Sequence, residues 1–214
     1  MPPPNYFLTI KPDYSGSWEF YGLIIWSLCA IAIIFSVIAN FILVQEAGSS
    51  KREKKSPVET GTMFLFFLFF FILIKYRVAG LEIASLYKPL FMVSGLLLAM
   101  LGTVFNIWGR IYLGSNWANQ IKIYKNQTLV TKGPFKIVRH PLYASLIWIY
   151  FGASIYFLNI LAFLANLLIF IPFMYYRSTQ EEKVLGKEFS EYSKYRKKTG
   201  MFFPKFVILN LWSR

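Results

Sequence analysis

The stretch "HPLYASLIWIYFGASIYFLNILAFLANLLIFIPFMYYR", residues 140–177, contains two apolar runs separated only by Leu158 and Asn159. The first run covers about Pro141–Phe157 and the second about Ile160–Tyr176. Helices joined by so short a connection form a tight antiparallel hairpin. The start of the first helix and the end of the second therefore meet at one end of the pair.

The composition indicates a membrane protein. Of the 214 residues, 56% are hydrophobic, 20% are aromatic and 15% are charged, whereas about 25% are charged in soluble domains. Apolar runs of about 18 residues or more are typical of transmembrane helices. The sequence predicts an all-α integral membrane bundle.

Three further apolar runs precede the hairpin, at about Trp18–Val44, Thr62–Leu81 and Leu90–Leu113. Together with the hairpin they give about five transmembrane helices. The two hairpin runs are short, and they cross the membrane where the bilayer thins locally. In the last run, Pro172 is expected to kink the helix.

The basic residues predict the orientation. Eighteen of the 23 lysines and arginines lie between the first and second runs, between the third and fourth, or after the fifth, and Arg110 near the end of the third run is a nineteenth on the same side. Because basic residues concentrate in cytoplasmic loops, the N-terminus is expected outside and the C-terminus in the cytoplasm. Topology and attraction to anionic lipid explain the net charge of +13, so a nucleic-acid partner has no support.

Cysteine and histidine usage disfavours a metal centre. Cys29 and His140 are the only residues of their types. One cysteine cannot form an internal disulfide, and this pair cannot supply the ligands of a zinc site. We expect no protein-bound metal.

Two predicted cytoplasmic segments show local patterns. Residues 119–135, "NQIKIYKNQTLVTKGPF", alternate apolar and basic residues and predict a short hairpin that turns at Lys125 and Asn126, or an extended loop. Residues 181–200, "EEKVLGKEFSEYSKYRKKTG", carry apolar residues at helical spacing. They predict an amphipathic helix at the membrane interface.

Polar residues gather where the hairpin ends meet. His140 precedes the first helical turn, whose unpaired N–H groups suit an anion. Arg177 and Glu181 are four residues apart and can pair on one helix face, while Glu182 is expected to point elsewhere. A basic flank and a solvated ion pair would account for these residues separately. The hairpin, however, brings them together with Arg139, which favours a site of convergent polar groups.

The third run carries small and polar residues at helical spacing. Gly95, Ala99 and Thr103 recur every four residues, which favours close helix packing. Asn106 and Arg110 share another face and are expected to point into the bundle rather than toward lipid. They either line a pocket or tie helices together, and the second role is favoured.

Four motifs in order and spacing carry a resemblance to a known family. "LGSNW", "QTLVTKGPFKIVRHPLY", "RSTQEE" and "EFSEYSKYRKKTGMFFP" resemble the isoprenylcysteine carboxyl methyltransferase family. The wider group of membrane methyltransferases, which includes phospholipid N-methyltransferases, shares the "RHPxY…EE" core. The resemblance covers about Leu113–Pro204, and the first two runs show none.

The resemblance implies a membrane enzyme that uses S-adenosylmethionine, bound in a cytoplasmic pocket. It implies spans facing lipid and substrate over 1–110, and a catalytic core over 111–214 with a C-terminal interfacial helix. It assigns the substrate carboxylate to Arg177, and catalytic roles to Arg177 and Glu181. Phe135 replaces a tyrosine found in many relatives. The implied cofactor contacts are Lys122, Gln127, Thr128, Leu129, Val130, Phe135, His140, Pro141, Tyr143 and Glu181.

Chemistry favours a lipophilic, prenyl-cysteine-like carboxylate as methyl acceptor. A carboxylate is ionised at neutral pH and needs a cation to hold it, not a base, and Arg177 is such a cation. An amine headgroup would need a base such as Glu181 or Glu182 and would be repelled by Arg177. Phospholipid or amine N-methylation is therefore the second interpretation.

Two further interpretations belong to other classes. An NADPH-dependent sterol or enone reductase would share the "RHPxY" element, but "LVTKGPF" and "EE" fit the methyltransferases better. A non-catalytic transporter or scaffold would place charged residues at mid-membrane depth. The first, fourth and fifth runs have none at their centres.

The charge distribution generates a test of topology. Single cysteines introduced near Ser50 and near Pro204 are both expected to react with an impermeant thiol reagent only from the cytoplasmic side. Both positions follow an odd-numbered span and lie among the basic residues. Labelling of the two sites from opposite faces of the membrane would contradict the five-span count.

Overall fold

The computed structural model describes residues 17–45, 50–54, 57–82, 86–116, 121–124 and 128–205. This part of the chain is helical apart from one short antiparallel pair of strands, so the expected helical class is confirmed. The elements in order are α1 (Ser17–Gln45), β1 (Ser50–Lys54), α2 (Pro57–Lys75), α3 (Lys88–Leu113), η1 (Gly114–Asn116), β2 (Ile121–Tyr124), η2 (Gly133–Lys136), α4 (Pro141–Tyr156), α5 (Ile160–Ala165), η3 (Asn166–Phe170), α6 (Ile171–Glu188) and α7 (Tyr192–Lys198).

Three stretches of helix are long and apolar enough to cross a membrane: Phe20–Asn40, Lys88–Asn116 and Ile160–Glu188. Large apolar side chains cover their outer faces, as is expected where lipid tails replace water. The apolar part of α2, Gly61–Lys75, and helix α4 are shorter. The expected count of about five spans therefore remains a prediction.

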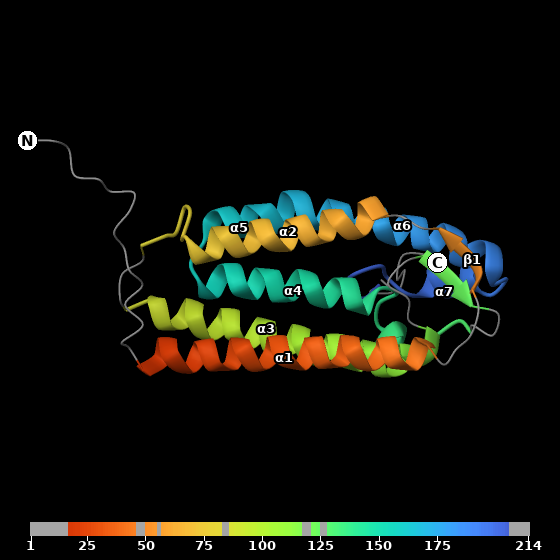
Figure 1. The fold of residues 1–214 in the computed structure, drawn as a ribbon, viewed down its shortest axis with the longest axis horizontal. Coiled ribbons are helices and arrows are strands. Elements are labelled where there is room, and N and C mark those ends of the chain that lie inside the picture. The colour runs from red at the N-terminus through yellow and green to blue at the C-terminus, as the bar shows by residue number, and fades with distance from the viewer. Residues whose placement is uncertain are drawn as a thin grey trace, which may run out of the picture.

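The helices run roughly along one common direction (Figure 1). Helix α4 lies between α3 on one side and the layer of α2 and α5 on the other, and α1 packs on α3 from outside. This central position gives α4 neighbours on both sides, so its N-terminal end can gather side chains from several elements.

The contact between α3 and α4 depends on small residues. A Cβ atom added at Gly95 would lie 2.5 Å from the Tyr156 amide nitrogen, and one added at Gly152 would lie 2.6 Å from the Gly95 carbonyl oxygen. The α3 residues that contact α4 recur at spacings of three and four, so the two separate faces expected from the sequence form one seam. The seam toward α4 consists of Gly95, Ala99, Gly102, Asn106 and Gly109.

Polar side chains tie α1, α3 and α4 together. Asn106 Nδ2 donates to Ser145 Oγ at 2.7 Å, and Arg110 Nε donates to Asn106 Oδ1 at 2.9 Å. Arg110 Nη1 also donates to Asn40 Oδ1 at 3.5 Å. The expected orientation of Asn106 and Arg110 into the bundle is confirmed, and they connect helices here.

The tight hairpin between α4 and α5 is confirmed. Leu158 takes a left-handed conformation with φ of 52°, which lets the chain reverse at once. Asn159 Oδ1 accepts from the Ala162 amide at 2.8 Å and caps α5. Its Nδ2 donates to the Leu73 carbonyl at 2.9 Å, so the hairpin also holds the end of α2.

Pro172 does not break the helix. The turn before it, Asn166–Phe170, is π-helical and joins α5 to α6, which accommodates the residue without an amide hydrogen. One extra residue in a turn rotates the side chains of all later residues by about 100° around the helix axis. This turn therefore sets which α6 side chains point into the bundle.

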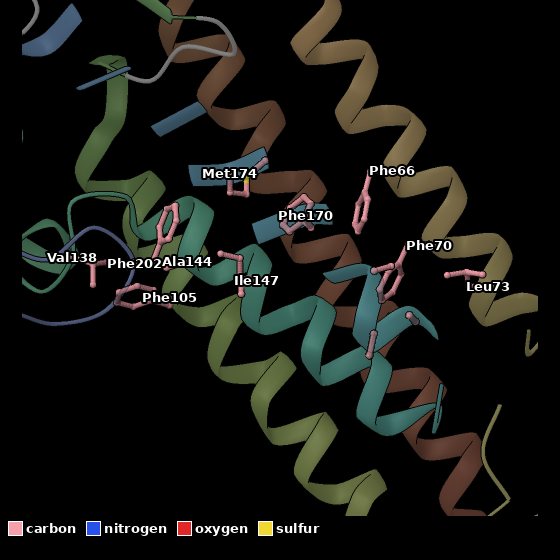
Figure 2. Close-up of a cluster of buried hydrophobic side chains, with 13 residues drawn as sticks. Phe66, Phe70, Leu73, Phe105, Val138, Ala144, Ile147, Phe170, Met174 and Phe202 are labelled. Atoms are coloured by element: carbon pink, nitrogen blue, oxygen red, sulfur yellow. The ribbon is translucent and has the colours of Figure 1, made fainter. Parts of the chain in front are cut away.

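Aromatic and aliphatic side chains fill the space between α2, α4 and the α5–α6 helix (Figure 2). Phe66 of α2 stacks on Phe170 with ring centroids 4.7 Å apart. Met174 and Ile147 continue the cluster toward the N-terminal end of α4. This packing holds α6 beside the start of α4.

Two local expectations need correction. Residues Ile121–Tyr124 are extended, but they pair with β1 rather than with the following residues. Residues 128–130 lie outside any strand, so the hairpin alternative is wrong, and the predicted turn at Lys125 and Asn126 lies outside the described residues. Residues 181–200 do not form one helix: α6 continues to Glu188, and α7 is a separate helix.

The seam generates a stability test with a matched control. Gly152→Ala would force its Cβ against the backbone of α3, and we expect a loss of about 1–3 kcal/mol. Gly61→Ala is the control, because nothing lies within 4 Å of its added Cβ and alanine favours helix by roughly 1 kcal/mol. Thermal unfolding in detergent measures both. Equal midpoints for the two variants would contradict the seam.

Candidate functional site

The segment before α4 is shaped by a glycine and a proline. Gly133 has φ of 58°, and a Cβ there would lie 2.7 Å from the Tyr112 ring, so only glycine fits without strain. The short helical turn Gly133–Lys136 follows. Pro141 then begins α4, and His140, 6% exposed, directly precedes it. The imidazole therefore lies at the end of the bundle where α4 begins.

The backbone of this segment is held by the chain beyond α7. The Arg139 amide donates to the Gly200 carbonyl at 2.8 Å, and the His140 amide donates to the Met201 carbonyl at 3.1 Å. Val138 and Gly200 form an isolated parallel bridge. We call residues 199–203 the C-terminal strap. The strap fixes the main chain from which two of the predicted site residues project.

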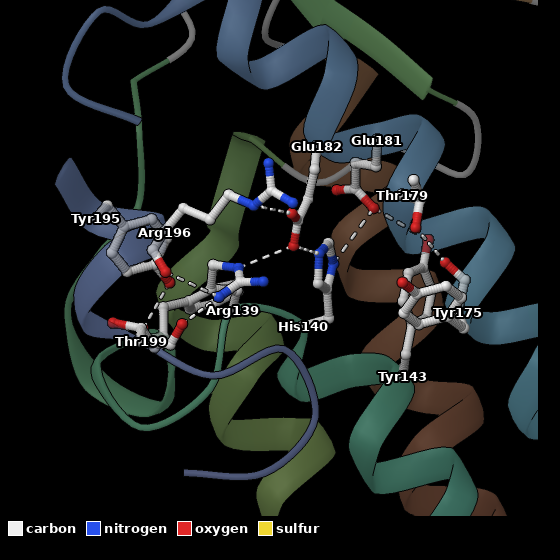
Figure 3. A network of polar contacts seen from close by, with 11 residues as sticks. Arg139, His140, Tyr143, Tyr175, Thr179, Glu181, Glu182, Tyr195, Arg196 and Thr199 are labelled. Atoms are coloured by element: carbon white, nitrogen blue, oxygen red, sulfur yellow. Dashed lines mark hydrogen bonds and ion pairs between the residues drawn. The ribbon is translucent and has the colours of Figure 1, made fainter. Parts of the chain in front are cut away.

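The Glu182 carboxylate lies at the centre of a polar network (Figure 3). Its Oε1 accepts from Arg139 Nε at 2.8 Å and lies 3.1 Å from His140 Nε2. Its Oε2 lies 3.1 Å from Arg196 Nε. Glu182 is only 6% exposed, and charged partners compensate the cost of burying its carboxylate.

Arg139 connects the same network to α7. Its Nη1 donates to the carbonyls of Arg196 and Thr199, which are among the terminal carbonyls of α7 that lack partners within the helix. Since its Nε is also bound to Glu182, Arg139 serves to position neighbouring elements.

Glu181 presents the more accessible carboxylate. Tyr143 donates its hydroxyl to Glu181 Oε2 at 3.2 Å, and His140 Nδ1 lies 3.6 Å from the same oxygen. The rings of His140 and Tyr143 stack with centroids 5.6 Å apart. The Glu181 side chain is 35% exposed, so it can meet a ligand. The expected proximity of the two hairpin ends is confirmed by these distances.

Arg177 lies one helical turn before Glu181 and is 6% exposed. Its Cζ lies 5.9 Å from the centre of the Tyr143 ring, within the range of a cation–π contact. Its Nη1 lies 3.0 Å from Met63 Sδ of α2. A single tyrosine thus contacts both Arg177 and Glu181.

The structure describes the other expected cofactor contacts to different extents. Thr128 bonds through its amide to Asn116 Oδ1 at 3.1 Å, which holds its segment at the end of α3. Leu129 and Val130 are half-buried in an irregular segment, and Pro141 is buried. Gln127 lies outside the described residues, and Lys122 lies in β2, where only the backbone is described.

Helix α7 packs its tyrosines against the site. Tyr195 donates its hydroxyl to the carbonyl of the buried Phe135 at 2.6 Å. Burial raises the pKa of the Tyr195 phenol above its usual range, so the group remains a neutral donor at physiological pH. The "KGPF" segment, α6 and α7 are therefore held as one unit.

Sequence reasoning missed the central role of Glu182, which was expected to point away from the pairing face. The signal was present as a four-residue spacing, since Phe170, Met174, Ser178 and Glu182 form one buried stripe. Extending this four-residue spacing into the polar end of the helix would have predicted that Glu182 is buried. No comparable signal marked Met63 of α2 as a neighbour of Arg177.

The arrangement suits a ligand with both cationic and apolar parts. Glu181 offers an accessible carboxylate for a positive group. Leu129 and Val130 offer half-buried apolar surface. Arg177 offers a guanidinium for an anion beside Tyr143. In chemical type, these residues fit S-adenosylmethionine and a second, anionic molecule.

Comparison with known proteins adds two findings. The model of the isoprenylcysteine carboxyl methyltransferase (ICMT) family matches residues 95–187. The cobalt-zinc-cadmium resistance protein CzcN of Cupriavidus metallidurans is 32% identical over 119 residues, which are 55% of this chain and 51% of that protein. The chain spans about half the length of this curated relative. The resemblance predicted from the motifs is confirmed.

The two adjacent glutamates generate a test of their different roles. Glu182→Gln removes the charge that Arg139, His140 and Arg196 contact, and we expect a loss of about 3 kcal/mol because the buried Arg139 guanidinium loses its counter-charge. Glu181→Gln is the matched control, with an expected loss below about 1 kcal/mol at its more exposed position. Unfolding in detergent measures both. Similar losses would show that Glu182 does not organise the network.

Proposed function

We propose, from the match of residues 95–187 to the model of the isoprenylcysteine carboxyl methyltransferase family, that the protein is an S-adenosylmethionine-dependent methyltransferase. Its three long apolar helices make it an integral membrane protein. We propose further that the acceptor is the carboxylate of a lipophilic, prenyl-cysteine-like molecule. The C-terminus and the site face the cytoplasm in this proposal, as the basic residues predict.

One observation carries the proposal. The Tyr143 hydroxyl binds Glu181, and the face of its ring meets the Arg177 guanidinium. An acidic group and a basic group thus contact the same aromatic side chain. This suits two ligands of opposite local charge that must meet, a positively charged methyl donor and a negatively charged acceptor.

The roles of the residues follow from their charges and burial. Glu181 binds a cationic part of the cofactor, and the stacked His140 and Tyr143 hold that carboxylate in place. The half-buried Leu129 and Val130 provide apolar contact. S-adenosylmethionine, when bound, supplies the methyl group from a sulfonium that is already a good leaving group.

Arg177 binds and orients the acceptor. An ionised carboxylate needs no base, so the protein contributes mainly position and charge. A guanidinium would bind both carboxylate oxygens through its planar fork, and each oxygen would keep a lone pair that can accept the methyl group. The Met63 contact places this cation beside α2, whose outer surface is apolar. An acceptor whose apolar tail lies in the lipid would therefore place its carboxylate beside Arg177.

An amine acceptor fits the same site less well. An ammonium group would lie beside the buried guanidinium of Arg177 and would be repelled. It would also need a base, and the Glu182 carboxylate is already engaged by Arg139, His140 and Arg196. The geometry therefore favours O-methylation.

Binding and transfer together test the proposal. Purified protein is titrated with S-adenosylmethionine by calorimetry, with NADPH as the alternative ligand. It is then incubated with labelled S-adenosylmethionine and a panel of prenyl-cysteine and phospholipid acceptors. We expect cofactor affinity to fall at least about tenfold in Glu181→Gln and His140→Ala, because each loses a contact worth about 1.5 kcal/mol or more.

Arg177→Ala separates the acceptor from the cofactor. We expect transfer to fall at least about a hundredfold with little change in cofactor affinity, and Arg177→Lys to rescue little because lysine lacks the planar fork. Binding of NADPH alone, or labelling of amines alone, would reject the proposal. Near-normal turnover in both Arg177 variants would reject the role of that residue.

A further inference from the structure

Helix α7 presents two different faces. Tyr192 and Thr199 are 3% and 6% exposed and lie against the site. Lys194, Lys197 and Lys198 are exposed and face away from it. The apolar face predicted for residues 181–200 is thus used, at Tyr192 and Tyr195, for packing within the protein. The outward face of α7 is cationic.

The cationic face lies in a strongly basic region. Between residues 183 and 205 the chain has seven lysines and arginines against two glutamates. Figure 1 places α7 and β1 at the same end of the bundle as the end of α6, and the sequence of β1, "SKREK", adds further basic residues. The apolar helices end here, so we expect these lysines at the depth of the lipid headgroups.

The lysines of α7 repel one another. Lys194 is three residues before Lys197 and four before Lys198, so all three lie on neighbouring positions of one helix surface. Like charges at these spacings destabilise a helix, and α7 has only seven residues. A layer of negative charge outside this face would remove the repulsion.

A short path leads from this face to the site. Arg196 is 63% exposed, yet its Nε lies 3.1 Å from Glu182 Oε2. Glu182 in turn binds Arg139 and His140. The strap beyond α7 bonds to the amides of the same two residues. The docking of α7 therefore determines how firmly His140 is held.

We propose that the outward face of α7, formed by Lys194, Lys197 and Lys198 with Arg196 at its edge, binds anionic phospholipid headgroups. Headgroup binding stabilises docked α7 and, through the Arg196–Glu182 contact, the position of Arg139 and His140. The consequence for cofactor binding rests on the proposed function, whereas the lipid contact and the ordering of His140 do not. The membrane composition thus regulates the site.

The first experiment measures lipid binding alone. The intact protein is placed in nanodiscs of phosphatidylcholine with phosphatidylglycerol, and the lipids retained on release are measured by native mass spectrometry. The triple variant Lys194→Gln, Lys197→Gln, Lys198→Gln is expected to lose phosphatidylglycerol preferentially, since each cation near an anionic surface contributes roughly fivefold in affinity. The control is the double variant Lys75→Gln, Arg77→Gln. Both residues are exposed, and they lie at the C-terminal end of α2 and just beyond it, away from α7 (Figure 1). Equal retention in both variants would overturn the lipid site.

The second experiment measures coupling without cofactor. Hydrogen exchange at the amides of Arg139 and His140 is expected to slow at least about threefold when phosphatidylglycerol is added to phosphatidylcholine nanodiscs. The effect should vanish in the triple variant and in Arg196→Gln, and persist in the control. Unchanged or faster exchange, or an effect retained in Arg196→Gln, would overturn the coupling.

A third measurement separates this inference from the proposed function. Calorimetry with S-adenosylmethionine in both nanodisc types is expected to show tighter binding with phosphatidylglycerol, and the gain should be lost in Arg196→Gln. If no cofactor binds in either membrane, the methyltransferase proposal fails, and the first two experiments still decide the lipid site and its coupling.

Discussion

A single buried carboxylate, that of Glu182, holds together three separate segments of the chain. It contacts Arg139 and His140 before α4, lies on α6, and reaches Arg196 on α7. A lone charge at this depth would be costly, so the site is stable only when all three parts are in place. Formation of the site and docking of the C-terminal region are therefore one event.

The position of this carboxylate depends on constraints far from it. The Leu158–Asn159 turn returns the chain at once, and the π-helical turn Asn166–Phe170 determines the rotation of the helix that follows. Glycines at the α3–α4 seam let α4 sit close to α3. Packing of the helices within the apolar layer thus determines where the polar side chains at the end of the bundle lie. Within that layer the backbone N–H and C=O groups must bond to one another.

The two adjacent glutamates have different roles in the site. The side chain of Glu182 is 5% exposed and bound to cations, which suits a structural charge. Glu181 is 35% exposed and bound to Tyr143, which suits a charge that meets a ligand. Because neighbouring residues on a helix point about 100° apart, one can face the protein and the other a pocket. The same logic gives α7 a packed tyrosine face and an outward lysine face.

The sequence by itself determined the apolar runs, the tight hairpin and hence the meeting of "RHPLY" with "RSTQEE", because a two-residue connection leaves no other geometry. Motifs in a fixed order also carried the resemblance to the isoprenylcysteine carboxyl methyltransferase family, whose model matches residues 95–187. Tertiary structure alone decided that Glu182 is the buried member of its pair, that Met63 lies beside Arg177, and that strand 121–124 pairs with β1. These contacts join residues about 40 to more than 100 positions apart, and local spacing carries no information on packing between separate elements.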